Sequence, residues 1–189
     1  INMHLRNIFL LTLFISLTLS QEQLGSDIDG EAANDRSGSS VSLNADGDKV
    51  AIGAYLNGGN GSSSGHVRVY EYSGGSWSQL GSDIDGEDAG DYSGATVSIN
   101  ADGDRVAIGA SANDGNGSNS GHVRVYEYSG GSWSQLGSDI DGEAAIDNFG
   151  SYISMNSDGD RVAIGAVTND GNGSNSGHVR VYEYSGGSW

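Results

Sequence analysis

Short runs in which apolar and polar residues alternate recur along the chain, separated by stretches of Gly, Ser, Asn and Asp. Alternation of this kind, enriched in β-branched and aromatic residues, is typical of strands. In the first part of the chain it predicts strands over 39–44, 49–54, 66–72 and 77–84. Asp-Gly and Gly-Gly steps suit tight turns after the first and third of these strands, whereas a longer Gly/Ser/Asn loop follows the second.

This group of four predicted strands occurs three times. Trp77, Trp133 and Trp189 are spaced 56 residues apart, and the run SGHVRVYEYSGGSW is identical in each copy. A unit of this kind cannot bury its apolar faces alone, so we expect the copies to stack on one another. The repeats span 23–78, 79–134 and 135–189.

Four antiparallel strands joined by hairpins are typical of a β-propeller blade. Small residues on the first two strands fit the crowded inner end of a blade, and Tyr and Trp on the last two fit the wider outer end. We therefore predict an all-β fold in which three repeats form a partial, open propeller, since closed propellers have about four to eight blades. A β-solenoid is the alternative, although its rungs are usually shorter than these repeats.

The first twenty residues differ in character from the repeats. From Met3, a basic start leads into an apolar run over 8–19, and small residues then precede Gln21. This order is typical of a secretory signal peptide, and the run is shorter than the ~20 residues that span a membrane comfortably. We expect residues 1–20 to be a signal peptide with upstream residues, and no membrane insertion after its cleavage. Residues 21–189 would then be a secreted or cell-surface fragment of a longer chain that supplies further blades; a retained anchor is the alternative.

The composition narrows the classes of partner. The chain has 25 acidic and 8 basic side chains and a formal net charge of −17. This charge disfavours nucleic acid and anionic membranes, because both bind clustered Lys and Arg. Divalent cations, basic proteins and neutral sugars are compatible with it. The absence of Cys excludes disulfides and thiolate metal sites, and the 32 Gly recur at fixed repeat positions, which favours turns over disorder.

The third copy contains Phe-Gly at 149–150, Ile-Gly-Ala at 164–166 and Gly-His-Val-Arg-Val-Tyr at 177–182. This pattern resembles the FG-GAP repeat of integrin α-subunit propellers and of many secreted bacterial proteins. In that family Phe-Gly opens strand one, Gly-Ala-Pro closes strand two, and Gly-x-Val-x-Val-Tyr forms strand three. Copies one and two have Ser-Gly instead of Phe-Gly, and no copy has the Pro. The resemblance covers 23–189 and implies propeller blades.

Calcium-binding members of that family carry acidic ligands in the loop between strands one and two. The matching stretch here, 44–48, is shorter and is followed by a basic residue, so we expect a plain hairpin turn. Alternating carboxylates also precede strand one in each copy. Closely spaced oxygens of this kind can share one Ca²⁺, although alternation also places them on the exposed side of a strand end. The candidate Ca²⁺ ligands are Asp27, Asp29, Asp35, Asp83, Asp85, Asp91, Asp139, Asp141 and Asp147.

No catalytic constellation stands out in the sequence. A set of nucleophile, base and acid is normally unique in a chain, whereas every candidate residue here is repeated. His66, His122 and His178 occupy one identical strand position, and we interpret them as structural residues. We therefore predict that the protein is not an enzyme.

The differences between copies fall mainly before and along strand one and in the loop between strands two and three. These two segments emerge on the same face of a four-stranded blade, and rigid scaffolds often bind ligands through such loops. We predict a secreted adhesion or recognition module for an extracellular protein or glycan; faster drift of long loops is the alternative cause of the variation. The alternative function is a structural repeat of a larger cell-surface protein, stiffened by calcium. The predicted ligand-binding residues are Arg36, Tyr55, Tyr92, Asn148, Tyr152 and Val167.

Overall fold

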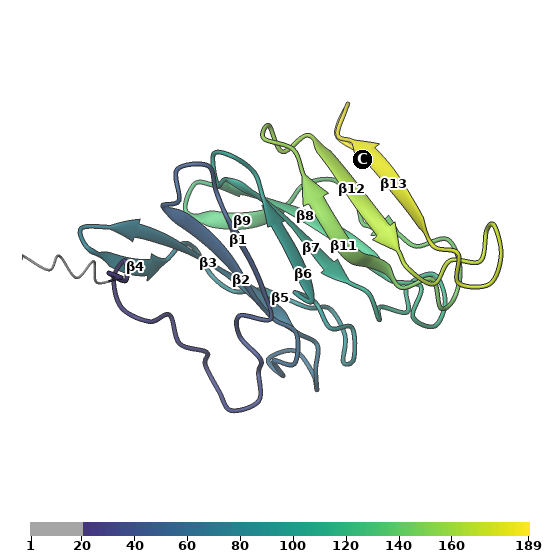
Figure 1. The fold of residues 1–189 in the computed structure, drawn as a ribbon, viewed down its shortest axis with the longest axis horizontal. Helices are drawn as coiled ribbons and strands as arrows, with labels where there is room; N and C mark the ends of the chain where they lie inside the picture. Colours follow the sequence, from purple (N-terminus) through teal and green to yellow (C-terminus); the bar gives the residue numbers. More distant parts are fainter. Residues whose placement is uncertain (1–20) are drawn as a thin grey trace, which may run out of the picture.

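A computed structural model describes residues 21–189, which form antiparallel sheets and contain no helix (Figure 1). The predicted all-β class is therefore confirmed. No segment that could cross a membrane as an apolar helix is found among these residues. The predicted signal peptide lies in residues 1–20, outside the described part of the chain.

Three sheets follow one another along the chain and along the long axis of the molecule (Figure 1). Sheet 1 contains β1 (Ser40–Leu43), β2 (Lys49–Ala54), β3 (His66–Ser73), β4 (Ser76–Gln79) and β5 (Ile84–Asp85). Sheet 2 contains β6 (Thr96–Ile99), β7 (Arg105–Ala110), β8 (His122–Ser129), β9 (Ser132–Gln135) and β10 (Ile140–Asp141). Sheet 3 contains β11 (Phe149–Met155), β12 (Arg161–Ala166) and β13 (His178–Glu183). The sheets do not close into a ring.

The predicted fourth strand is broken into two short pieces. In sheet 1, β4 and β5 pair with different parts of β3, and Gly81 lies between them with a positive φ of 77°. Only Gly adopts this conformation without strain, so the strand bends here. The bend places the Leu80 carbonyl where the Nε1 of Trp133 donates a hydrogen bond to it, at 2.7 Å. The break in the strand therefore allows this contact with the next repeat. The alternation of apolar and polar residues within one strand does not predict it.

Small residues on the first two strands let neighbouring sheets approach closely. The backbone N–H groups of Val97 and Ile99 donate to the hydroxyls of Ser40 and Ser42, at 3.0 and 3.1 Å. A Cβ placed on Gly53 would lie 2.0 Å from the carbonyl oxygen of Gly94. The first strands of sheets 1 and 2 thus satisfy polar groups on the free edge of the following sheet, which protects that unpaired edge.

Apolar side chains fill the two spaces between the three sheets. One cluster joins sheet 1 to sheet 2 and includes Val67, Val69, Val97 and Ile99; the other joins sheet 2 to sheet 3. The outer faces of sheets 1 and 3 are different, because their apolar side chains are uncovered. Val41 is 62% exposed, whereas its repeat equivalent Val97 is 6% exposed. Each sheet therefore has two apolar faces, and the two terminal faces are open.

Candidate functional site

The long loops and the connections between sheets meet on one face of the molecule, which we call the loop face. Asn60 on the loop after β2 donates its Nδ2 to the carbonyl oxygen of Gly86, at 2.9 Å. Ser93 donates its backbone N–H to the Ser64 carbonyl, at 3.0 Å. The same contacts recur one repeat later. The loop face comprises residues 55–65 with 86–94, 111–121 with 142–148, and 167–177.

Two of the predicted ligand-binding residues contact each other on this face. The rings of Tyr55 and Tyr92 meet edge to face with their centroids 5.7 Å apart. Tyr92 and its repeat equivalents Arg36 and Asn148 all have positive φ values, of 59°, 60° and 51°. This conformation is rare outside Gly, and strained backbone of this kind concentrates at binding sites. At the next junction, Asn148 donates its Nδ2 to the Ser111 carbonyl at 3.2 Å.

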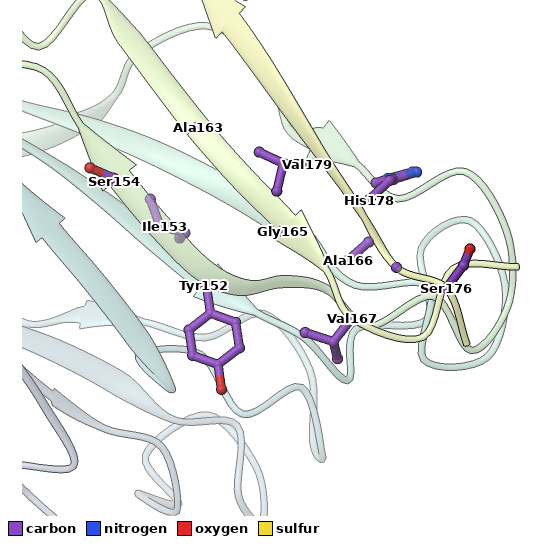
Figure 2. A pocket seen from close by; sticks show the side chains of 11 residues that line it. Tyr152, Ile153, Ser154, Ala163, Gly165, Ala166, Val167, Ser176, His178 and Val179 are labelled. Atoms are coloured by element: carbon purple, nitrogen blue, oxygen red, sulfur yellow. The ribbon is translucent and has the colours of Figure 1, made fainter. Parts of the chain in front are cut away.

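The other predicted ligand-binding residues lie apart from this tyrosine pair. Tyr152, which is 71% exposed, and Val167 line a hollow of about 610 Å³ on the outer face of sheet 3, together with Val179 (Figure 2). Arg36 is exposed at the opposite end, before β1. The six residues therefore form separate groups at successive junctions and at the two ends.

The nine aspartates predicted to bind calcium do not gather into three sets. Asp35, Asp91 and Asp147 are buried, and each accepts a hydrogen bond from the Nδ2 of an Asn on the loop after the second strand, at 2.8–2.9 Å. These three carboxylates hold the connections against the loops. Asp29, Asp85 and Asp141 are exposed. Asp27, Asp83 and Asp139 each accept from the Nε2 of a Gln four residues earlier.

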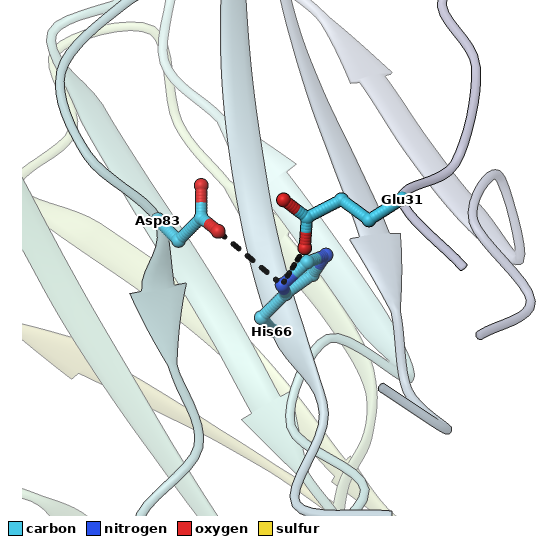
Figure 3. Close-up of side chains that lie close together, drawn as sticks. All are labelled: Glu31, His66 and Asp83. Carbon is cyan, nitrogen blue, oxygen red and sulfur yellow. Dashed lines mark ion pairs between the residues drawn. The ribbon is translucent and has the colours of Figure 1, made fainter. Parts of the chain in front are cut away.

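Two mixed clusters of His, Glu and Asp are the most concentrated chemistry within residues 21–189. In the first, the Nδ1 of His66 lies 3.8 Å from Glu31 Oε2 and 3.7 Å from Asp83 Oδ2 (Figure 3). In the second, the corresponding distances from His122 to Glu87 and Asp139 are 3.9 and 3.8 Å. In each cluster the three atoms lie within 4.8 Å of one another. His178 and Glu143 repeat part of the arrangement, at 3.8 Å.

Burial and the neighbouring Arg124 guanidinium change the pKa of the histidine in the second cluster. His122 is 2% exposed, and desolvation together with the Arg124 guanidinium lowers the pKa of this imidazole, although the carboxylates of Asp139 and Glu87 act in the opposite direction. The ring is therefore neutral at neutral pH and keeps one nitrogen lone pair. Arg124 lies 3.2 Å from Glu87 Oε1, the oxygen that does not face His122.

An acidic hollow of about 330 Å³ opens from this second cluster onto the loop face. Asp88 and Asp114 on its rim replace Ala32 and Gly58 of the first repeat, so the second cluster has the more negative surroundings. Asp83 and Asp139 are among the predicted metal ligands, whereas their Glu and His partners are not. Recurrence at fixed repeat positions marks Glu31 and His66 as well. They are 35 residues apart, however, and no local pattern indicates that they lie together.

No model of a protein family matches the sequence, and no curated protein is similar to it. Among solved structures, periplasmic gluconolactonase from Pseudomonas aeruginosa is 14% identical with a TM-score of 0.49, over 78% of this chain and 39% of that one. Hydrazine synthase from Kuenenia stuttgartiensis is 14% identical with a TM-score of 0.46, over 76% and 33%. A candidate 6-phosphogluconolactonase from Bacteroides uniformis is 13% identical with a TM-score of 0.42, over 77% and 40%. This chain thus spans less than half the length of each.

The prediction that the protein is not an enzyme is corrected by these comparisons. Two of the similar structures bear the names of lactonases. We therefore withdraw the exclusion of catalysis, and these similarities assign no reaction to this chain.

Proposed function

We propose that residues 21–189 are a section of an extracellular β-propeller in which each sheet is one blade, and that the loop face binds a protein or glycan ligand. One observation carries this proposal. The contacts that build the loop face, such as Asp91 with Asn113, repeat without change, whereas the residues displayed above them vary. Tyr55 and Tyr92 meet at one junction, and Ser111 and Asn148 meet at the next.

The chemistry of the face favours neutral or basic ligands. Tyr92 is partly exposed beside Tyr55, and aromatic side chains supply large contact area at little cost in conformational entropy. The loop face also carries exposed amide and carboxylate side chains, such as those of Asn60 and Asp88, which suits hydrogen bonding to hydroxyls or to basic side chains. The acidic surface suits neither nucleic acid nor anionic lipid.

The open terminal faces support the proposal that further blades of the same longer chain continue the stack. Val179 and Val181 of sheet 3 are 70% and 68% exposed, whereas their equivalents Val123 and Val125 are buried under the following sheet. On sheet 1, Val41 and Leu43 are the equivalents of the buried Val97 and Ile99. Each terminal face thus has the composition of an internal interface, and the FG-GAP resemblance agrees with such an array.

A glycan array and a panel of extracellular proteins test the proposed function. We expect the secreted chain to bind a member of one panel, and the pair Tyr55→Ala and Tyr92→Ala to abolish that binding. Ser132→Ala, in the hairpin at the opposite end of sheet 2, is the matched control and should bind normally. Equal loss in the control, or full binding by the tyrosine variants, would refute the assignment of the binding face.

A structural repeat stiffened by a cation is the second candidate function. The Glu–His–Asp clusters favour it, because a shared ion would join a connection, a strand and the segment after the fourth strand. A melting temperature unchanged by a divalent ion at saturating concentration would remove this candidate.

A further inference from the structure

The two Glu–His–Asp clusters have a geometry that is wrong for hydrogen bonds and close to that of a metal site. Each Nδ1 lies 3.7–3.9 Å from its two carboxylate oxygens, which is beyond hydrogen-bonding distance. Ligands bound at about 2.1 Å in a tetrahedral site are about 3.4 Å apart. Contraction by about 0.3–0.5 Å along each N···O distance, and by up to about 1.4 Å between the two carboxylate oxygens, would therefore bring the three atoms to ligand spacing around one ion.

The buried imidazoles of His66 and His122 also point to a bound ligand. His66 and His122 are each 2% exposed, and their Nδ1 atoms face the carboxylates with no hydrogen-bond partner within residues 21–189 (Figure 3). Neither Nδ1 is among the fully buried atoms without a partner in this part of the chain, so an ion can reach it from solvent. A bound cation would supply a partner, since neutral imidazole donates its lone pair to metals.

The neighbours of each carboxylate orient it toward the histidine. Gln135 donates its Nε2 to Asp139 Oδ1 at 2.6 Å, and Arg124 faces Glu87 Oε1 at 3.2 Å. In both cases the held oxygen is the one that does not face His122, so Oδ2 and Oε2 are left free and directed at Nδ1. The first cluster has the same arrangement, through Gln79 and Arg68. Outer partners that fix metal ligands in this way are a regular feature of metal sites.

We propose that Glu87, His122 and Asp139 bind one divalent transition-metal ion of the Zn²⁺ class, and that Glu31, His66 and Asp83 form a second, weaker site. One imidazole nitrogen with two carboxylate oxygens suits Zn²⁺, whereas Ca²⁺ takes six to eight oxygen ligands and no imidazole. The site at His122 is the stronger because Asp88 and Asp114 add negative charge around it. This inference is independent of ligand binding by the loop face.

Titration calorimetry of the chelator-treated chain with ZnCl₂, and separately with CaCl₂, tests the proposal. We expect two Zn²⁺ ions per chain with unequal affinities, and much weaker Ca²⁺ binding. Asp139→Asn and Glu87→Gln, which keep the side-chain shape, should each remove the tighter ion. Gln135→Ala should weaken it by about 10-fold, as loss of an outer partner does. Asp102→Asn, an exposed carboxylate in the turn after β6, is the control and should change nothing.

Visible absorption of the Co²⁺-substituted chain reports directly on metal coordination. It would not respond if the histidines had only a structural role. We expect ligand-field bands from Co²⁺ bound to imidazole, reduced in His122→Gln and lost in the His66→Gln/His122→Gln double variant. The proposal is overturned if no Zn²⁺ binds at millimolar concentration. It is also overturned if the cluster variants bind Zn²⁺ as the control does, or if Ca²⁺ binds as tightly as Zn²⁺.

Discussion

The close approach of neighbouring sheets can be tested with one pair of Gly→Ala variants. Gly53 and Gly165 occupy the same repeat position, in β2 and β12, and neither has a positive φ. A Cβ on Gly53 would lie 2.0 Å from the Gly94 carbonyl oxygen, and its next nearest atoms also belong to the backbone of Gly94. A Cβ on Gly165 would meet nothing closer than 3.7 Å, which is ordinary contact. The main difference between the two substitutions is therefore whether the next repeat, through the backbone of Gly94, lies above the new methyl group.

The expected effects have opposite signs. Gly165→Ala should stabilise the chain by about 0.4–1 kcal/mol, because Ala restricts the unfolded state without straining the native one. Gly53→Ala must separate sheets 1 and 2 by more than about 1 Å, and overpacking of this kind costs about 1–3 kcal/mol. The free energies of unfolding should then differ by roughly 1.4–4 kcal/mol, against a total of about 5–15 kcal/mol for a domain.

Urea denaturation followed by tryptophan fluorescence measures this difference. Trp133 reports on the junction between sheets 1 and 2, because its Nε1 donates to the Leu80 carbonyl. Equal free energies of unfolding for the two variants would refute the stacking of sheet 2 on sheet 1. Destabilisation by Gly165→Ala alone would refute the open outer face of sheet 3.

Three further predictions concern single contacts. Asp91→Ala leaves the buried Nδ2 of Asn113 without its 2.9 Å partner and should lower the free energy of unfolding by about 1–3 kcal/mol in urea, whereas exposed Asp85→Ala should have little effect. Trp133→Phe removes the hydrogen bond to Leu80 and should cost about 1 kcal/mol; a free energy equal to that of the parent would show the bond to be irrelevant. Burial and Arg124 lower the pKa of His122 in the folded state, so the unfolded chain binds more protons below the ordinary pKa of 6.5. The free energy of unfolding is therefore unaffected by His122 above pH 6.5 and falls as the pH drops below that value. In metal-free protein His122→Gln should flatten this decline, and an unchanged pH profile would contradict the shift.

The regular features of the fold can be predicted from the local pattern of apolar, polar and turn residues. The first three strands of each repeat and the tight Asp-Gly turns are visible in the alternation and turn residues, since each depends on neighbours close in sequence. The break at Gly81 is different. It depends on Trp133, which is 52 residues away and packs against the bend. Pattern within one strand carries no information about such a contact.

The candidate site shows the same limit. Alternating aspartates suggest ligands that share a calcium ion. Asp91, however, is buried and accepts a hydrogen bond from Asn113, which is 22 residues away. Histidines at one strand position suggest a structural role, yet His122 faces Glu87 and Asp139 from two other segments. In both cases the residue types are visible in the sequence, and only the folding of distant segments together decides their partners.

In the proposed function the loop face is the binding surface of a rigid stack of sheets. Hydrogen–deuterium exchange of the chain with and without its ligand tests this role of the loop face, because protection reports on backbone amides along the whole chain. We predict slower exchange on ligand binding in residues 55–65 and 86–94, with the tight turns at 44–48 and 100–104 unchanged. Protection confined to those tight turns, with the loop face unaffected, would contradict it.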